Sequence, residues 1–144
     1  MKKVATIILN RNLPEVTDNL YEHLEEYDGD ITDIFVLESG SDSGNLSKYV
    51  TWHANSEEAN KNGLRYCRGM NYALSCLWKD NRFYNYDAFF LLTNDTELEK
   101  NPSISVLLEI LNDNKEIGIL SPCGRKWGER FLLDDQKTKF FWYI

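Results

Sequence analysis

The sequence lacks the cysteine pattern of a disulfide-stabilised or zinc-binding protein. Its three cysteines, Cys67, Cys76 and Cys123, form no C-x-x-C pair, and their number is odd. Neither a disulfide framework nor a zinc site is therefore indicated, and a reducing compartment fits best.

Long hydrophobic runs and an excess of basic residues are also missing. The apolar segment behind Met1-Lys2-Lys3, residues 4–9, is too short for the core of a signal peptide, and no segment approaches the ~20 apolar residues of a membrane span. We expect a cytoplasmic protein without a transmembrane segment, with peripheral association at the inner membrane face left open. The net charge of -7 argues against nucleic acid as the main partner. A nucleotide ligand stays compatible with it, because a divalent cation neutralises phosphates against carboxylates.

Glycine-rich nucleotide motifs are absent as well. Neither G-x-G-x-x-G nor G-x-x-x-x-G-K-[ST] occurs, which excludes the common dinucleotide-binding and P-loop classes. The segment that follows the first apolar run, residues 10–14, contains no glycine and no acidic residue. The missing glycine argues against a sugar nucleotidyltransferase, and the missing acids argue against a phosphoacceptor receiver domain.

What the sequence does contain is an alternation of strand and helix patterns. The 144 residues are 42% hydrophobic and 13% aromatic, enough for one domain with a real core. Helical periodicity occurs at residues 16–27 and 66–78 and again after Asn101-Pro102, whereas residues 55–62 are polar and Gly63 marks a break. Pro14 suits the first turn of the first helix, with Asn12 as its cap. Strands are predicted at residues 4–9, 31–37, 49–54, 88–92 and 117–120.

This alternation predicts a three-layer α/β/α sandwich with a mostly parallel central sheet. The run at residues 88–92 is unbroken and rich in aromatics, so we expect a central strand that is buried on both faces. Residues 131–133 and 140–144 are predicted to form a hairpin. We expect one domain over residues 1–144, with a core over 1–124 and this hairpin in 125–144. Because the chain stops inside an aromatic strand, we expect either a fragment or a homo-oligomer formed through that strand.

Five stretches together resemble the nucleotide-sugar half of family-2 glycosyltransferases, which have the GT-A fold. Ile8-Leu9-Asn10-Arg11 is similar to the ending of the family's first strand, and Val36-Leu37-Glu38-Ser39-Gly40-Ser41 is similar to that of the second. Leu91-Leu92-Thr93-Asn94-Asp95-Thr96-Glu97-Leu98 resembles the family's D-x-D-type motif. Arg68-Gly69-Met70-Asn71 resembles a helix start, and Ile117-Gly118-Ile119-Leu120-Ser121-Pro122 resembles the strand that follows it. The resemblance covers residues 4–124.

The resemblance implies a hexosyl- or rhamnosyl-type transferase that serves cell-surface polysaccharide synthesis. It would move a sugar, with inversion, from a UDP- or dTDP-sugar to an unidentified acceptor, assisted by Mg²⁺ or Mn²⁺. Thr93-Asn94-Asp95-Thr96 brings hard oxygen donors to the end of a strand, where open α/β sheets bind ligands. We therefore predict that Asp95 is the metal ligand. The predicted nucleotide-binding residues are Leu9, Asn10, Arg11, Glu38, Ser39, Arg68, Asn71 and Asn94.

Two positions depart from the family's pattern. Glu38 replaces the usual Asp at the end of the second strand, and Asn94 stands where an acid often precedes the metal-binding Asp. No general base is identifiable, because the family's acceptor half follows this region. A non-catalytic nucleotide-sugar-binding or assembly module is therefore the alternative. Ordinary structural roles also remain open: a polar turn for Asp95 and Thr96, a solvated loop carboxylate for Glu38 and a surface position for Arg68.

Overall fold

The computed structural model describes residues 3–120 of the chain. The chain forms two compact units, residues 1–104 and 105–144, and we describe each by itself. The first unit contains all the described strands and most of the helices. In chain order its elements are β1 (Val4–Asn10), α1 (Pro14–Asp28), β2 (Thr32–Ser39), β3 (Val50–Ala54), α2 (Ser56–Asn62), α3 (Tyr66–Lys79), the 3-10 helix η1 (Phe83–Asn85) and β4 (Ala88–Thr93).

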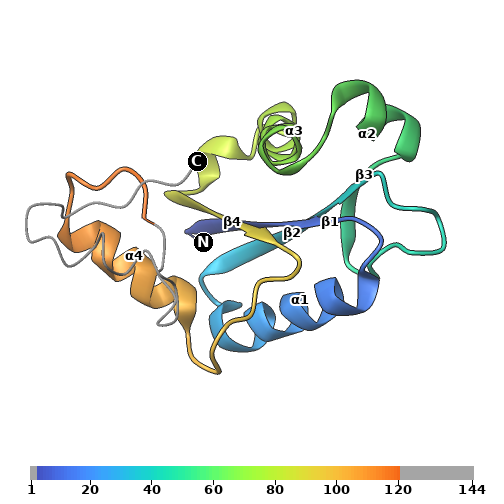
Figure 1. The fold of residues 1–144 in the computed structure, drawn as a ribbon. Coiled ribbons are helices and arrows are strands. Elements are labelled where there is room, and N and C mark those ends of the chain that lie inside the picture. The colour runs from blue at the N-terminus through green and yellow to red at the C-terminus, as the bar shows by residue number, and fades with distance from the viewer. Residues whose placement is uncertain (1–2, 121–144) are drawn as a thin grey trace, which may run out of the picture. The chain divides into compact units, whose positions relative to one another are not determined.

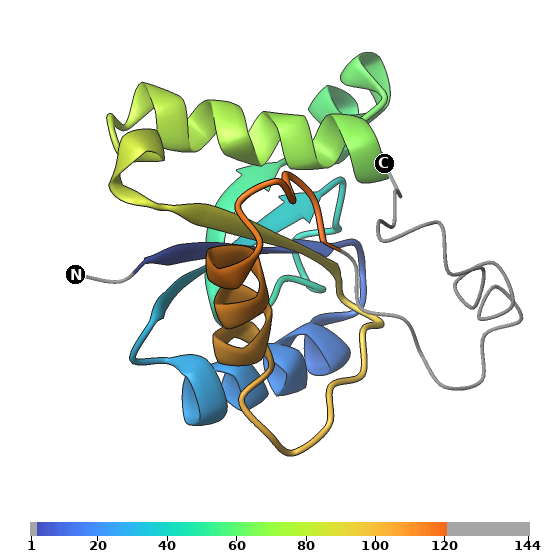
Figure 2. The same ribbon diagram turned by 90° about the vertical axis from the view of Figure 1, so that its left-hand side faces the viewer.

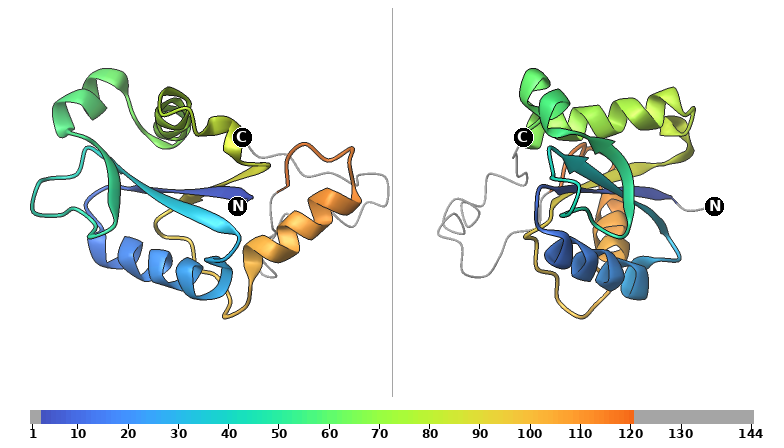
Figure 3. Two further views of the ribbon diagram at one scale, coloured as in Figure 1. Left: turned by 180° about the vertical axis from the view of Figure 1, so that it is seen from behind. Right: turned by 90° about the vertical axis from the view of Figure 1, so that its right-hand side faces the viewer.

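Within residues 3–120, the strands form one four-stranded sheet in the order β3-β2-β1-β4, and every neighbouring pair is parallel. Helix α1 lies on one face of this sheet, and α2 and α3 lie on the other (Figure 1). The turned views show the same order of layers (Figures 2 and 3). The predicted α/β class with a parallel sheet is thus confirmed. Because all strands run the same way, their carboxyl ends share one edge of the sheet.

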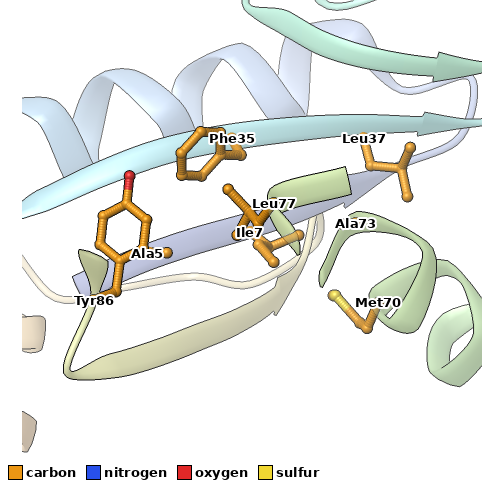
Figure 4. Packing of buried hydrophobic residues seen from close by; sticks show 8 residues of the cluster. All are labelled: Ala5, Ile7, Phe35, Leu37, Met70, Ala73, Leu77 and Tyr86. Atoms are coloured by element: carbon orange, nitrogen blue, oxygen red, sulfur yellow. The ribbon is translucent and has the colours of Figure 1, made fainter. Parts of the chain in front are cut away.

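A hydrophobic cluster fills the space between the sheet and α3. It is built from alternate residues of β1 and β2 and from one stripe of α3, which is the arrangement expected for periods of two and 3.6 residues (Figure 4). Its buried members are Ala5, Ile7, Phe35, Leu37, Met70, Ala73, Leu77 and Tyr86. The intervening β1 residues Val4, Thr6 and Ile8 are also buried. Strand β1 is therefore an interior strand of the sheet, and every one of its residues except the half-buried Leu9 is buried.

Strand β4 differs from its prediction. Residues 88–92 were expected to form a central strand that is buried on both faces, and that expectation is wrong for the described residues. Strand β4 pairs only with β1 there, and Ala88, Phe89, Phe90 and Leu91 are half-buried. An apolar run indicates that the side chains of a strand pack against other parts of the protein. It does not indicate whether a neighbouring strand pairs with each of its edges.

Two local predictions about helices also need correction. Asn12 does not cap α1: it adopts a left-handed conformation with φ 58°, and Leu13 holds the cap position. Residues 55–62 are polar and show no helical periodicity, yet Ser56–Asn62 forms α2. The Asn55 side chain accepts a hydrogen bond from the Glu58 N–H, and Gly63 ends the helix with φ 59°. Only Ala59 of this helix is buried, so the sequence shows no hydrophobic periodicity from which the helix could be predicted.

Helix α4 (Ser103–Asp113) confirms the helix predicted after Asn101-Pro102. Its first backbone N–H groups, those of Ser103 and Ile104, donate to the buried Asp28 carboxylate at distances of 2.9 and 3.2 Å. The strand predicted at residues 117–120 is wrong, because these residues are a bend and irregular chain, and Ile119 is 45% exposed. The hairpin predicted at 131–133 and 140–144 lies outside the described residues.

Gly40 provides a direct test of the loop that follows β2. It has φ 80°, and a Cβ at this position would lie 3.0 Å from the Ala59 Cβ. We expect Gly40→Ala to lower the free energy of unfolding by about 1–3 kcal/mol, because it combines backbone strain with a close contact. Urea unfolding followed by tryptophan fluorescence measures the change. Gly44→Ala in the same loop is the matched control, since its Cβ meets nothing within 4 Å; an equal loss in both variants would contradict this account.

Tyr86 makes the stability of the first unit depend on pH. Its hydroxyl donates to Asp33 Oδ2 at 2.5 Å and accepts from the Arg82 guanidinium at 2.8 Å. Burial, followed by the hydrogen bond to Asp33, raises the pKa of Tyr86 from 10.0 to about 12. The folded state therefore holds this proton more tightly than the unfolded chain. The contribution is complete below pH 10 and is lost as the pH rises toward 12. In Tyr86→Phe we expect a shallower fall of unfolding free energy over that range, measured by urea titrations at successive pH values; an unchanged slope would exclude Tyr86 as the cause.

Candidate functional site

Polar side chains from three adjacent strands meet at the carboxyl edge of the sheet. The strand register places Asn10 of β1 opposite Glu38 of β2, and Leu9 opposite Thr93 of β4. The Asn10 amide nitrogen donates to both oxygens of Glu38 at 3.0 Å. The Asn94 amide nitrogen, just beyond β4, donates to Asn10 Oδ1 at 2.8 Å. Predicted site residues that lie 28 and 84 positions apart in the sequence are thus in direct contact.

Glu38 is completely buried, and both of its oxygens accept hydrogen bonds. Besides the Asn10 amide, the donors are Ser41 Oγ at 2.5 Å and the Ser47 backbone N–H at 2.7 Å. A buried carboxylate is tolerated only with such partners. Here they fix the start and the end of the loop that follows β2. The contact of Glu38 with a ligand, expected from the sequence, stays a prediction; a ribose hydroxyl would have to displace one of these donors.

The same loop is tied to the β1–α1 turn and to α1. The Asn12 backbone N–H donates to Ser41 Oγ at 3.0 Å, and Asn12 Oδ1 accepts from the Asp42 N–H at 2.8 Å. Further along, Ser47 Oγ donates to Asp18 Oδ1 at 2.5 Å. These partners were not predicted from the sequence. The Ser-rich composition of residues 39–47 was the available signal, but it is equally typical of a solvated loop.

The side chain of Tyr49 also attaches the β2 loop to α1. It stacks on Tyr21 of α1 with ring centroids 3.9 Å apart, and its hydroxyl donates to Glu22. Lys48 forms an exposed ion pair with the same Glu22 at 2.6 Å. Exposed pairs of this kind contribute little stability. The buried Glu38 bonds and the aromatic stack are therefore what hold the loop.

The start of α3 lies close to the end of β1. A Cβ at Gly69 would lie 2.8 Å from Leu9 Cδ1, so this close approach requires glycine. Leu9 is half-buried at this contact, and Arg68 is exposed with its guanidinium donating to the Asn62 carbonyl at 3.2 Å. Asn71 is also exposed. The helix start predicted from sequence is thus brought to the edge of the sheet that carries Asn10.

Two other predicted residues lie nearby in different environments. Arg11 is exposed, with its guanidinium carbon 3.7 Å from the position that a Cβ on Gly40 would occupy. Ser39 is buried, and its hydroxyl donates to the Leu64 carbonyl. Arg11 is therefore available to a ligand, whereas the hydroxyl of Ser39 is engaged within the fold.

Asp95 is exposed and sits in the turn that ends β4, where the Thr96 N–H donates to the Thr93 carbonyl at 3.2 Å. Within residues 3–120, no three His, Cys, Asp or Glu side chains are grouped to hold a metal ion. A single carboxylate beside the Asn94 amide nevertheless suits Mg²⁺ or Mn²⁺, because these ions take their other oxygen ligands from phosphates and water. The donor set fits a cation that arrives with a phosphorylated ligand.

Comparison of the chain with protein-family models, with curated proteins and with solved structures gives no significant match. Among the described helices, none combines the length and the apolar character that crossing a membrane requires.

The bonds to Glu38 predict a large effect of its removal. Glu38→Ala leaves the buried Asn10 amide and Ser47 N–H without their acceptor, so we expect the free energy of unfolding to fall by at least about 2 kcal/mol. Urea unfolding measures this loss. Asp42→Ala is the matched control, because Asp42 is an exposed carboxylate in the same loop. A Glu38→Ala variant as stable as Asp42→Ala would show that the loop does not depend on the buried carboxylate.

Proposed function

We propose that this chain binds the nucleotide-sugar donor of a family-2, GT-A-type glycosyltransferase and transfers the sugar to an acceptor. The observation that carries the proposal is the hydrogen-bonded series Glu38–Asn10–Asn94, with the exposed Asp95 next to it. Motifs that are far apart in the sequence resemble that family one by one. Their convergence on the carboxyl edge of a parallel sheet, where α/β folds bind ligands, supports taking them as one site.

The chemistry of the exposed groups agrees with a diphosphate ligand. A nucleoside diphosphate leaves readily only when its developing negative charge is neutralised, and a divalent cation on the phosphates supplies that. We assign Asp95 to hold the cation and the exposed Arg11 and Arg68 to meet the phosphates. Asn94 is assigned to a hydroxyl of the ribose or the sugar. The free thiols of Cys67 and Cys76 fit the reducing cytoplasm, where we place the reaction.

We assign no general base among the described residues, and the acceptor hydroxyl must lose a proton during transfer. The rival proposal is therefore a module that binds the donor without turnover. Incubation with UDP-sugars and dTDP-sugars in the presence of Mn²⁺ separates the two. Slow release of free sugar supports an enzyme, and binding without any release supports the module.

Asp95 is the residue on which metal-dependent binding should depend. We expect Asp95→Ala to weaken Mn²⁺-dependent binding of UDP or dTDP by at least about tenfold, because the cation loses its charged protein ligand. Isothermal titration calorimetry with and without Mn²⁺ measures the effect.

Asp87→Ala is the matched control, because Asp87 is an exposed carboxylate at the opposite, amino end of β4. Its binding constants should equal those of the wild type. If Asp95→Ala binds as tightly as Asp87→Ala, Asp95 is not a metal ligand. If the wild type binds no nucleoside diphosphate, the proposed function is rejected.

A further inference from the structure

The series Glu38–Asn10–Asn94 fixes the direction in which its amide groups point. A carboxylate only accepts hydrogen bonds, so the Asn10 atom that faces Glu38 is its nitrogen. That nitrogen lies 3.0 Å from each of the two oxygens of Glu38, which share its hydrogen bond. With its nitrogen held on the side of Glu38, Asn10 turns its oxygen toward its other partners.

The direction is passed on to Asn94. Asn10 Oδ1 accepts from the Leu13 backbone N–H at 3.3 Å and from Asn94 Nδ2 at 2.8 Å. Since an oxygen acceptor requires a donor, Asn94 must present its nitrogen to Asn10. The oxygen of Asn94 is then the atom that remains for an outside group.

This oxygen is accessible to solvent. No hydrogen bond to Asn94 Oδ1 occurs within the described part of the chain, and Asn94 itself is half-buried. Among the described residues, the only buried side-chain nitrogen or oxygen without a partner is His23 Nε2. Among the described residues, Asn94 Oδ1 therefore has no hydrogen-bond partner and is reached by solvent, in the residue next to Asp95.

We propose that Glu38 is a positioning residue: acting through Asn10, it makes Asn94 present an acceptor oxygen to a hydroxyl group of the ligand. This inference rests on the proposed function for the identity of the ligand, whose ribose or transferred sugar supplies the hydroxyl. It assigns Glu38 a role that does not require contact with the nucleotide. A site built this way favours a ligand that carries a hydroxyl at this point over a deoxy or ether analogue.

Reversing the series provides the test. In Glu38→Gln the two oxygens that face the Asn10 nitrogen become one oxygen and one NH2 group. This new donor competes for Asn10 Oδ1 and turns Asn10, and then Asn94, around in a fraction of the molecules. Glu38→Gln/Asn10→Asp restores the original direction, because the carboxylate introduced at position 10 accepts both from the new amide at position 38 and from Asn94. We expect the side-chain amide protons of Asn94 to exchange faster with water in the single variant and at the wild-type rate in the double variant. ¹⁵N NMR measures these exchange rates, and the Asn94→Ala variant assigns the Asn94 signals. Asp42→Asn is the control for the loss of a negative charge in the loop.

A double-mutant cycle of positions 38 and 94 tests the same series through the free energy of unfolding and needs no ligand. Asn94→Asp places an acceptor against Asn10 Oδ1, so it should destabilise the wild type. In the Glu38→Gln background the turned Asn10 donates to the carboxylate introduced at position 94, so the same change should cost less. Positions 38 and 94 are joined only through Asn10 in the described hydrogen bonds. Additive effects in urea unfolding, or an Asn94 exchange rate that Glu38→Gln leaves unchanged, would overturn the proposal.

Ligand binding identifies the hydroxyl. We expect Glu38→Gln to weaken binding roughly 3- to 10-fold, as for the loss of one hydrogen bond, and the Glu38→Gln/Asn10→Asp double variant to recover it. If Glu38→Gln binds both UDP and UDP-sugar more weakly, the hydroxyl that contacts Asn94 belongs to the ribose. If it binds only UDP-sugar more weakly, the hydroxyl belongs to the transferred sugar. Equal binding by the wild type and Glu38→Gln would reject the contact with Asn94. A wild type that binds no nucleotide would reject the proposed function, while amide exchange would still decide the direction of the series.

Discussion

The buried carboxylate of Glu38 is the interaction on which the edge of the sheet depends. Removing a carboxylate from water is costly unless its charge is met by well-placed donors. Glu38 receives them from a side chain of β1, a side chain of its own loop and a backbone N–H at the far end of that loop. Because one acceptor collects donors from several segments, the strand ends and the loop take up their positions together.

This arrangement explains what could be predicted from the sequence. Strands β1 and β2 were recognisable because their apolar residues are contiguous, and α1 and α3 because theirs recur every turn. Once a parallel sheet is inferred, the polar residues after each strand must share one edge. The grouping of Asn10, Glu38 and Asn94 follows from that topology without any knowledge of individual contacts.

The inward orientation of Glu38 could not be predicted in the same way. A glutamate that precedes a loop of serines has the composition of a solvated turn, and its burial depends on Asn10, which lies 28 residues away. Helix α2 could not be predicted for a related reason: it is held by caps at Asn55 and Gly63 and not by a hydrophobic stripe. The edge position of β4 depends on pairing, which hydrophobicity does not encode. In each case the decisive interaction is a specific hydrogen bond or neighbour, and sequence periodicity reports only burial.

The fixed loop and the exposed turn divide the site into two parts with different physical roles. The β2 loop has its polar groups bonded to Glu38, Asn12 and Asp18, so few of them are left to rearrange around a ligand. The turn that ends β4 instead exposes Asp95 and one oxygen of Asn94. Groups held in place before a ligand arrives lose little entropy on binding, which favours recognition by a small number of contacts.

The two departures from the glycosyltransferase pattern are linked through Asn10. Glu38 holds the nitrogen of the Asn10 amide on its own side, so Asn10 presents its oxygen to Asn94. An aspartate at position 94 would then set a negative charge against the Asn10 oxygen, whereas an asparagine supplies the donor that this oxygen needs. A chain with this glutamate therefore favours an amide before Asp95, and the amide still offers an oxygen outward. Considered separately, each position weakens the resemblance; considered as hydrogen-bonding partners of one residue, each accounts for the other.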